Sequence, residues 1–192
     1  MKHTTKRLWL ALAALAVMAV ASDVKAAFPN PTQALDIRVS INAQKSLEVG
    51  TTWYNFGAMP ISSTVVSGSS VAVWNDSGGL VETYTLQASS AVAIGGGGTD
   101  WVLAGAAGQD TYALGAQFAA GTGADIQGAW TTDALTYYAV ACTDEVFGNT
   151  THAEAGYQVG PAGMRYLFFR IQTPSAVTDT KYHLATVTLA VQ

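Results

Sequence analysis

The chain has 192 residues, of which 49% are hydrophobic, only 11% are charged and one is cysteine. Its formal net charge is −4 at pH 7, because 13 acidic residues outnumber 9 basic ones. This balance argues against nucleic acid as a partner, since phosphate binding needs a basic patch, and it disfavours attachment to anionic lipid for the same reason.

The N-terminus has the pattern of an export signal. Three basic residues precede an apolar run from Leu8 to Ala21, and Val24-Lys25-Ala26 supplies small residues at the two positions that a signal peptidase reads. The run is too short to cross a bilayer about 30 Å thick as a helix. We therefore expect residues 1–26 to be a cleaved signal peptide, with a retained anchor as the alternative, and the protein to be secreted, extracellular or at the cell surface.

Removal of 26 of the 192 residues leaves 166, a length that suits one domain with a single core. Of these, five residues are basic and twelve are acidic, a net charge of −7. Residues 27–33 contain Phe-Pro-Asn-Pro and are expected to be an extended linker. Residues 34–192 are then expected to form one domain without an internal disulfide, because Cys142 is the only cysteine. A buried strand thiol is expected for it, and an intermolecular disulfide is the alternative.

The first predicted strand has the cleanest alternation in the chain. Leu35, Ile37, Val39 and Ile41 alternate with polar residues, which predicts a strand with one face buried. The proline-containing linker before it could let this segment leave its own domain and add to a neighbour's sheet, so it is a candidate assembly strand. The alternative is an ordinary first strand paired within its own domain.

Extended segments continue along the chain. Residues 46–56 form a run interrupted at Gly50, and residues 71–75 and 81–88 are predicted to form a hairpin across the turn-forming sequence Asp76-Ser-Gly-Gly79. Val71, Val73, Tyr84 and Leu86 are its expected inward residues. Further runs cover residues 101–103, 110–118 and 134–142, the last with both faces partly buried. Residues 143–161 lack a strand pattern.

The C-terminal region is predicted to hold two more strands, over residues 164–172 and 181–192. In the second strand, Tyr182 and Leu184 occupy even-numbered positions, whereas Val187, Leu189 and Val191 occupy odd-numbered ones. A regular strand would point these two sets to opposite faces. Either a bulge near Ala185 reconciles them, or only the second half faces the core. The expected core includes Ile37, Val39, Tyr112, Leu114, Phe168 and Ile171.

These patterns predict an all-β protein. No stretch after Ala26 carries a helical apolar stripe, and short strands with turn signals at near-regular spacing favour an antiparallel β-sandwich of about seven to nine strands. A jelly roll is the main alternative, and an up-and-down barrel ranks below it.

The segment from Asp36 to Ala88 also carries a resemblance. It runs from the alternating strand through Asn55-Phe56-Gly57 to VAVWNDSG and ETYTLQAS. This resembles the immunoglobulin-like sandwiches of bacterial secreted surface proteins and, more loosely, spore-coat-U-type subunits of bacterial pili, which assemble by donating a strand to a neighbour. The resemblance implies an immunoglobulin-like fold and transfers no functional residues. The paired cysteines common in that pilus group are missing from this chain.

The sequence offers no catalytic motif, so we expect neither an enzyme nor a cofactor or metal requirement. The best ligand candidates are Asp144, Glu145, His152 and Glu154, whose carboxylates could hold calcium, although acidic residues also keep a long loop solvated. Trp130, in a glycine-rich segment, is the tryptophan most suited to stacking on a sugar, whereas core packing is expected for most of the others. Asn75 and Asn149 fit the glycosylation acceptor pattern.

Together these features predict a secreted structural subunit of a cell-surface layer, sheath or filament that self-associates by strand exchange or binds other surface proteins. The alternative is an extracellular binding module for a glycan or another surface partner.

Overall fold

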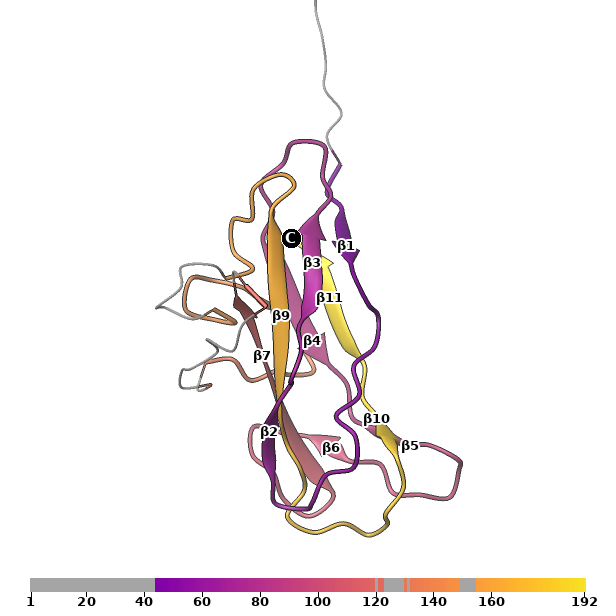
Figure 1. Cartoon of the computed structure of the whole chain (residues 1–192). Coiled ribbons are helices and arrows are strands. Elements are labelled where there is room, and N and C mark those ends of the chain that lie inside the picture. Colours follow the sequence, from indigo (N-terminus) through magenta and orange to yellow (C-terminus); the bar gives the residue numbers. More distant parts are fainter. Residues whose placement is uncertain (1–43, 120, 123–129, 131, 149–154) are drawn as a thin grey trace, which may run out of the picture. The chain divides into compact units, whose positions relative to one another are not determined.

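The computed structural model describes residues 44–119, 121–122, 130, 132–148 and 155–192. Within them the protein is all-β, as expected, and contains no helix (Figure 1). The strands are β1 (Leu47–Val49), β2 (Thr64–Val66), β3 (Val71–Asn75), β4 (Tyr84–Ala88), β5 (Val92–Ala93), β6 (Val102–Leu103), β7 (Thr111–Ala119), β8 (Val140–Ala141), β9 (Met164–Gln172), β10 (His183–Leu184) and β11 (Val187–Val191). The predicted signal peptide, the linker 27–33 and the strand over Leu35–Ile41 lie outside the described residues. In the part of the chain that is described, no helix is long and apolar enough to cross a membrane.

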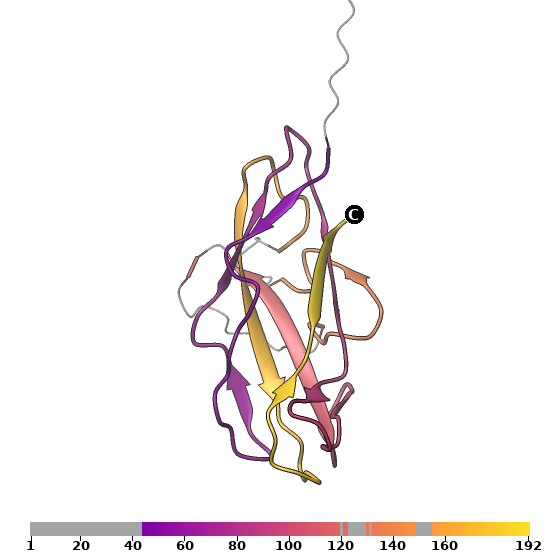
Figure 2. The same ribbon diagram turned by 90° about the vertical axis from the view of Figure 1, so that its right-hand side faces the viewer.

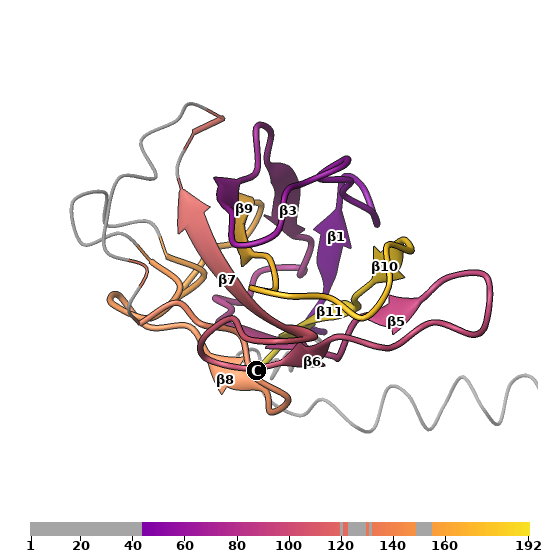
Figure 3. The ribbon, with the colours of Figure 1, turned by 90° about the horizontal axis from the view of Figure 1, so that it is seen from below.

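Two curled sheets carry most of the structure, an arrangement consistent with a β-sandwich. The larger sheet has the order β1-β3-β9-β7-β6, with β2 also paired to β9, and the smaller one has the order β11-β4-β8. A separate two-stranded ribbon joins β10 to β5. Among the strands of the described residues, only β6 and β7 pair in parallel. Seen from below in Figure 3, β3 and β9 lie on one side and β8 and β11 on the other.

The core lies between the inner faces of these two sheets. β3 and β4 alternate strictly between buried and half-buried residues, because successive side chains of a strand point to opposite faces. The expected inward residues of these strands are confirmed, and Val73, Tyr84 and Leu86 among them have no exposed surface. Tyr112 and Leu114 are also buried, as expected. Each large apolar side chain buried in this way contributes about 1.5–3 kcal/mol to stability.

The predicted hairpin between residues 71–75 and 81–88 is wrong. β3 pairs with β1 and β9, whereas β4 pairs with β8 and β11 in the other sheet. The intervening chain crosses between the sheets, and the buried Asn75 side chain holds this crossing by donating to the carbonyl oxygens of Leu80 and Val159, both at 2.8 Å. The predicted inward residues were nevertheless right, because β3 and β4 face the same core from opposite sides.

Phe168 is a buried core residue, as expected, but it does not share the central core with its neighbours on β9. Leu167, Phe169 and Ile171 point into the central core, whereas Phe168 has the opposite parity and lies on the outer face of β9. It is nevertheless buried, because a second small cluster with Ala119, Trp130 and Tyr166 forms there.

The last predicted strand is divided. β10 ends at Leu184 and β11 begins at Val187, and only the second half faces the core. Tyr182 and Leu184 are 80% and 61% exposed. The parity change in the sequence therefore marks the point at which the chain leaves the ribbon with β5 and joins β4.

Two other predicted strands are much shorter than expected. The run over residues 46–56 forms a strand only at Leu47–Val49, and the run over residues 134–142 only at Val140–Ala141. In the second run Leu135 and Cys142 are buried, but Tyr137 and Tyr138 are 49% and 81% exposed. Their side chains lie on a loop at the surface and not between two sheets.

Candidate functional site

An apolar groove of about 820 Å³ opens between the two main sheets alongside β11. Side chains of the core form its floor, among them Leu114, Leu167 and Phe169. One wall is the segment of residues 49–61, and the other is formed by residues 179–189. Figure 2 faces the side of the molecule on which β1 and β11 lie. The central core is thus accessible from solvent along this side.

The inner face of β11 is incompletely covered. Val187, Leu189 and Val191 point toward the core and pack against it, yet all three remain only half-buried. Their partners on β4 include Tyr84 and Leu86, which have no exposed surface. Inward side chains of a closed sandwich are covered from every side, so the half-burial of β11 indicates room for one more apolar element beside it.

The backbone of β11 also has an open edge. Ser89 N donates to Thr186 O at 2.9 Å and Gln192 N donates to Thr83 O at 2.8 Å. These two bonds show which residues of β11 form the hydrogen-bonded pairs with β4. Hydrogen-bonded pairs alternate along an antiparallel ladder, so Val187, Leu189 and Val191 direct their N–H and C=O groups away from β4. Among the described residues no strand pairs with that edge.

The opposite wall is held in place by aromatic packing and a tight turn. Tyr54 contacts Phe56 edge-on with ring centroids 4.8 Å apart, and its hydroxyl accepts from Gly68 N at 2.8 Å. Asn55 Oδ1 accepts from Gly57 N at 2.8 Å, and Gly57 has φ of 73°, a conformation that glycine adopts without strain. Trp53 is left 74% exposed at the rim of the groove. Trp53 is therefore an exception to the core packing expected for most of the tryptophans.

One end of the groove is closed by Trp101 and His183. Their rings stack with centroids 3.9 Å apart, and His183 Nε2 lies 2.9 Å from Thr99 O. Trp101 is half-buried, and no group in the described part of the chain hydrogen-bonds to its Nε1. The stack ties the β5–β10 ribbon to the loop before β6.

The predicted ligand residues form no site in the described part of the chain. Asp144 and Glu145 are exposed on a turn where the Thr143 hydroxyl accepts from Glu145 N at 3.2 Å. His152 and Glu154 lie outside the described residues, and within those described no three His, Cys, Asp or Glu side chains gather as metal ligands would. Trp130 is half-buried and packs against the cluster that contains Phe168. The guanidinium carbon of Arg170 lies 6.0 Å from the centroid of the Trp130 ring.

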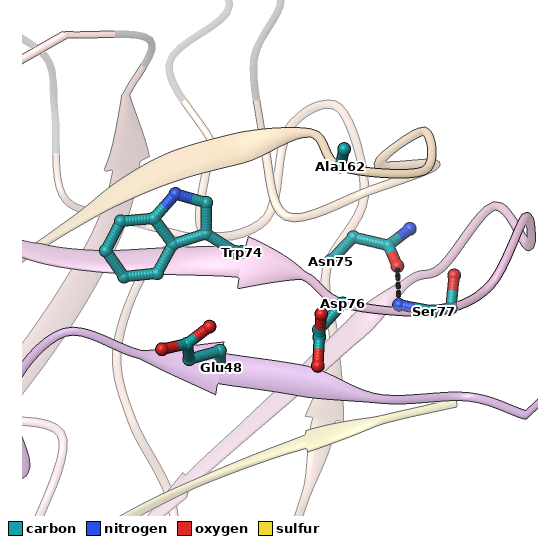
Figure 4. A pocket seen from close by; sticks show the side chains of 6 residues that line it. All are labelled: Glu48, Trp74, Asn75, Asp76, Ser77 and Ala162. Atoms are coloured by element: carbon teal, nitrogen blue, oxygen red, sulfur yellow. Dashed lines mark hydrogen bonds between the residues drawn. The ribbon is translucent and has the colours of Figure 1, made fainter.

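A smaller pocket of about 250 Å³ lies where β1 passes the end of β3 (Figure 4). Glu48 and Asp76 are exposed at its mouth. Asn75 is buried, and its side chain is already satisfied, since it donates twice and accepts from Ser77 N at 2.9 Å. The Asn75 side chain therefore serves the chain crossing between the sheets.

A buried polar pair that the sequence patterns missed lies on the outer face of β7. Asp133 Oδ2 accepts from Gln117 Nε2 at 2.6 Å, and Asp133 Oδ1 accepts from Phe147 N at 2.7 Å. Burial raises the pKa of Asp133, although both hydrogen bonds act in the opposite direction. The one available signal was Gln117, a polar residue inside an otherwise apolar strand. Cys142 is likewise buried, as expected, and burial raises the pKa of its thiol to about 12.

Comparison with known proteins yields no relative. The chain matches no protein-family model, and no curated protein or solved structure gives a significant match.

Proposed function

We propose that the protein is a secreted structural subunit of a cell-surface layer, sheath or filament, and that its subunits join by strand addition. In this proposal the alternating segment of residues 34–43 from one subunit fills the apolar groove of the next and pairs with the free edge of β11. The observation that carries it is the coincidence of an open core with an open strand edge at the same place.

The strand order supports an immunoglobulin-like sandwich without its last strand. In that fold, strands A, B, E and D form one sheet and strands C, F and G form the other. β1, β3, β9 and β7 pair in the order expected of A, B, E and D, while β4 and β11 pair as C and F do. The place of strand G is beside β11, where the groove lies. A strand added there would complete the smaller sheet.

Segment 34–43 suits this place in length and pattern. Ten extended residues span about 33 Å, enough to run past all the lining residues between Tyr182 and Leu189 on that side of the groove. Leu35, Ile37, Val39 and Ile41 would all point inward, where they would cover Val187, Leu189 and the core side chains of the floor. The main-chain hydrogen bonds would supply affinity and the alternating side chains specificity.

Filling by a neighbour would remove the two features that make the isolated domain prone to uncontrolled pairing. An unpaired strand edge and a contiguous apolar surface both promote aggregation or mark binding sites. It would also join subunits without disulfides, in keeping with the single buried Cys142.

A glycan-binding module is the second candidate, and Trp53 is the observation that favours it. Its indole ring is 74% exposed at the groove rim, and Tyr182, which also borders the groove, is 80% exposed. Aromatic faces of this kind can stack on sugar rings. The mostly apolar lining favours a strand over a hydrated sugar, so strand addition remains the leading proposal.

Deletion of residues 27–43 tests the leading proposal. We expect the shortened protein to remain folded with β-type circular dichroism, to lose assembly, and to bind a synthetic peptide of residues 34–43. A control peptide with Ile37 and Val39 replaced by Asp should not bind. Unfolding of the shortened protein, together with a full-length protein that stays monomeric at high concentration, would contradict the proposal.

A further inference from the structure

The β5–β10 ribbon exposes four large apolar side chains on one face. Leu184 lies opposite Val92 in the pairing, and Ile94 N donates to Tyr182 O at 2.8 Å, which places Tyr182 beside Ile94. Positions at this spacing share a face. Val92, Ile94, Tyr182 and Leu184 are 54%, 55%, 80% and 61% exposed, and together they are called the ribbon patch here.

The ribbon patch is presented by a firmly held scaffold. On the other face of the ribbon, His183 stacks on Trp101. The carboxylate of Asp179 accepts from Thr99 N at 2.5 Å and from Lys181 N at 2.8 Å, and Asp100 accepts from Ala93 N at 2.9 Å. The apolar face is therefore a fixed feature of the surface. Contiguous exposed apolar surface of this kind marks interaction sites.

The ribbon patch lies at the end of the groove opposite to the point where the N-terminal segment joins the domain. Ser46 is fixed there, because its N–H donates to Glu82 Oε1 at 2.7 Å and its carbonyl accepts from Asp76 N at 2.9 Å. Gln192, just after β11, donates to Thr83 O next to Glu82. This end is called the entry end. The ribbon precedes β11 and therefore lies at the start of that strand, and Tyr182 and Leu184 border the groove there.

The direction of the added strand decides which surfaces of two subunits meet. If segment 34–43 runs parallel to the neighbour's β11, its residue 43 lies at the neighbour's entry end, so the entry ends of the two subunits meet. The neighbour's own segment also leaves its domain at that end, so the two segments would compete for the same space. If it runs antiparallel, residue 43 emerges beside the ribbon patch. Only Gln44 and Lys45 then separate it from the fixed Ser46, a reach of about 10 Å. The entry end of the donor is thus brought against the ribbon patch, and the contact repeats from head to tail.

We propose that the ribbon patch is the docking surface for the entry end of a second copy of this chain. On the donor the contact centres on Val81, which is 59% exposed beside Glu82, the residue that holds Ser46. This inference rests on the proposed strand addition and adds to it a second, separable contact between subunits.

The test replaces Val92 and Ile94 together by lysine, as Val92→Lys/Ile94→Lys. Both residues belong to the patch, and neither lines the groove. We expect binding of a labelled peptide of residues 34–43 to stay within about twofold of the wild type, while the protein concentration needed for assembly rises about tenfold or more, as measured by sedimentation. Val81→Lys should have the same effect from the donor side. The matched control is Val66→Lys, at a residue 38% exposed on β2, which should assemble as the wild type does.

Assembly of Val92→Lys/Ile94→Lys or of Val81→Lys at wild-type concentrations, with peptide binding intact, would overturn this inference and leave strand addition standing. Failure of the wild-type protein both to assemble and to bind the peptide would overturn the proposed function and the docking surface with it.

Discussion

Asp133 and Gln117 show how one buried pair holds a loop against the outer face of β7. Both side chains are 1% exposed, and Asp133 joins β7 to Phe147 through two hydrogen bonds. Gly115 allows this close approach, because a Cβ there would lie 3.1 Å from Asp133 O and from the Trp130 ring. Gln117 Oε1 has no partner among the described residues, so within them the pair is satisfied on one side only.

The raised pKa of Asp133 makes stability depend on pH. In the folded state the carboxyl group holds its proton more tightly than in the unfolded chain. The contribution of this group is therefore fully present below the unfolded pKa, about 3.9, and is lost as pH rises through the higher folded pKa. Asp133→Asn should remove this dependence and leave stability at pH 7 equal or higher, since a rotated Gln117 amide could accept from the new Nδ2–H. Urea unfolding across pH 3–7 measures both effects.

Asp133→Ala is the matched comparison for this prediction. It leaves Phe147 N–H without its acceptor in a buried position and should lower stability by about 1–3 kcal/mol at every pH. An Asp133→Asn protein that keeps the wild-type pH profile would mean that the carboxylate does not titrate in this range.

At the scale of elements, β11 is defined by its two different edges. One edge is paired to β4 along its whole length, whereas the backbone groups of Val187, Leu189 and Val191 point away from β4, and the first two of these residues line the groove. An added strand that runs antiparallel would place its inward residues directly opposite these three as hydrogen-bonded pairs. A parallel strand would instead direct the N–H groups of its outward residues to β11.

N-methylation of the peptide of residues 34–43 separates these two directions. Methyl groups on the amides of Ile37 and Val39 should abolish binding to the protein that lacks residues 27–43, because those N–H groups face β11 in the antiparallel arrangement. Methyl groups on Arg38 and Ser40 should leave binding nearly unchanged. The opposite outcome, measured by fluorescence anisotropy, would show parallel insertion and rule out head-to-tail contact at the ribbon patch.

Period-two patterns predicted the inward residues of β3, β4 and β7 because burial depends only on the parity of a strand. They did not predict which strands pair. The Asp76-Ser-Gly-Gly79 turn has the same local chemistry whether the chain forms a hairpin or crosses to the other sheet, and that choice depends on the distant partners Leu167 and Leu189. Phe168 is buried as expected, but the sequence did not indicate that it belongs to a second cluster on the outer face of β9. The groove itself leaves no pattern in the sequence, since its lining comes from segments far apart in the chain.

At the scale of the whole molecule, the proposed strand addition would explain why this β domain carries an open core. The same segment, 34–43, could instead fill the groove of its own subunit by running parallel to β11, with residues 44–46 as the connection. Both arrangements cover Leu189 with an apolar residue of the segment. They differ in whether the covering residue belongs to the same chain.

Cysteine cross-linking measures this difference directly. Leu189→Cys is combined in turn with Ile37→Cys, Val39→Cys or Ile41→Cys on a Cys142→Ala background, since opposite inward positions of paired strands lie within reach of a disulfide. Mild oxidation of at least one pair should yield a ladder of covalent multimers on a denaturing gel, and reduction should return it to monomer. A cross-linked monomer without multimers, or no cross-link at any of the three positions, would contradict assembly through the groove.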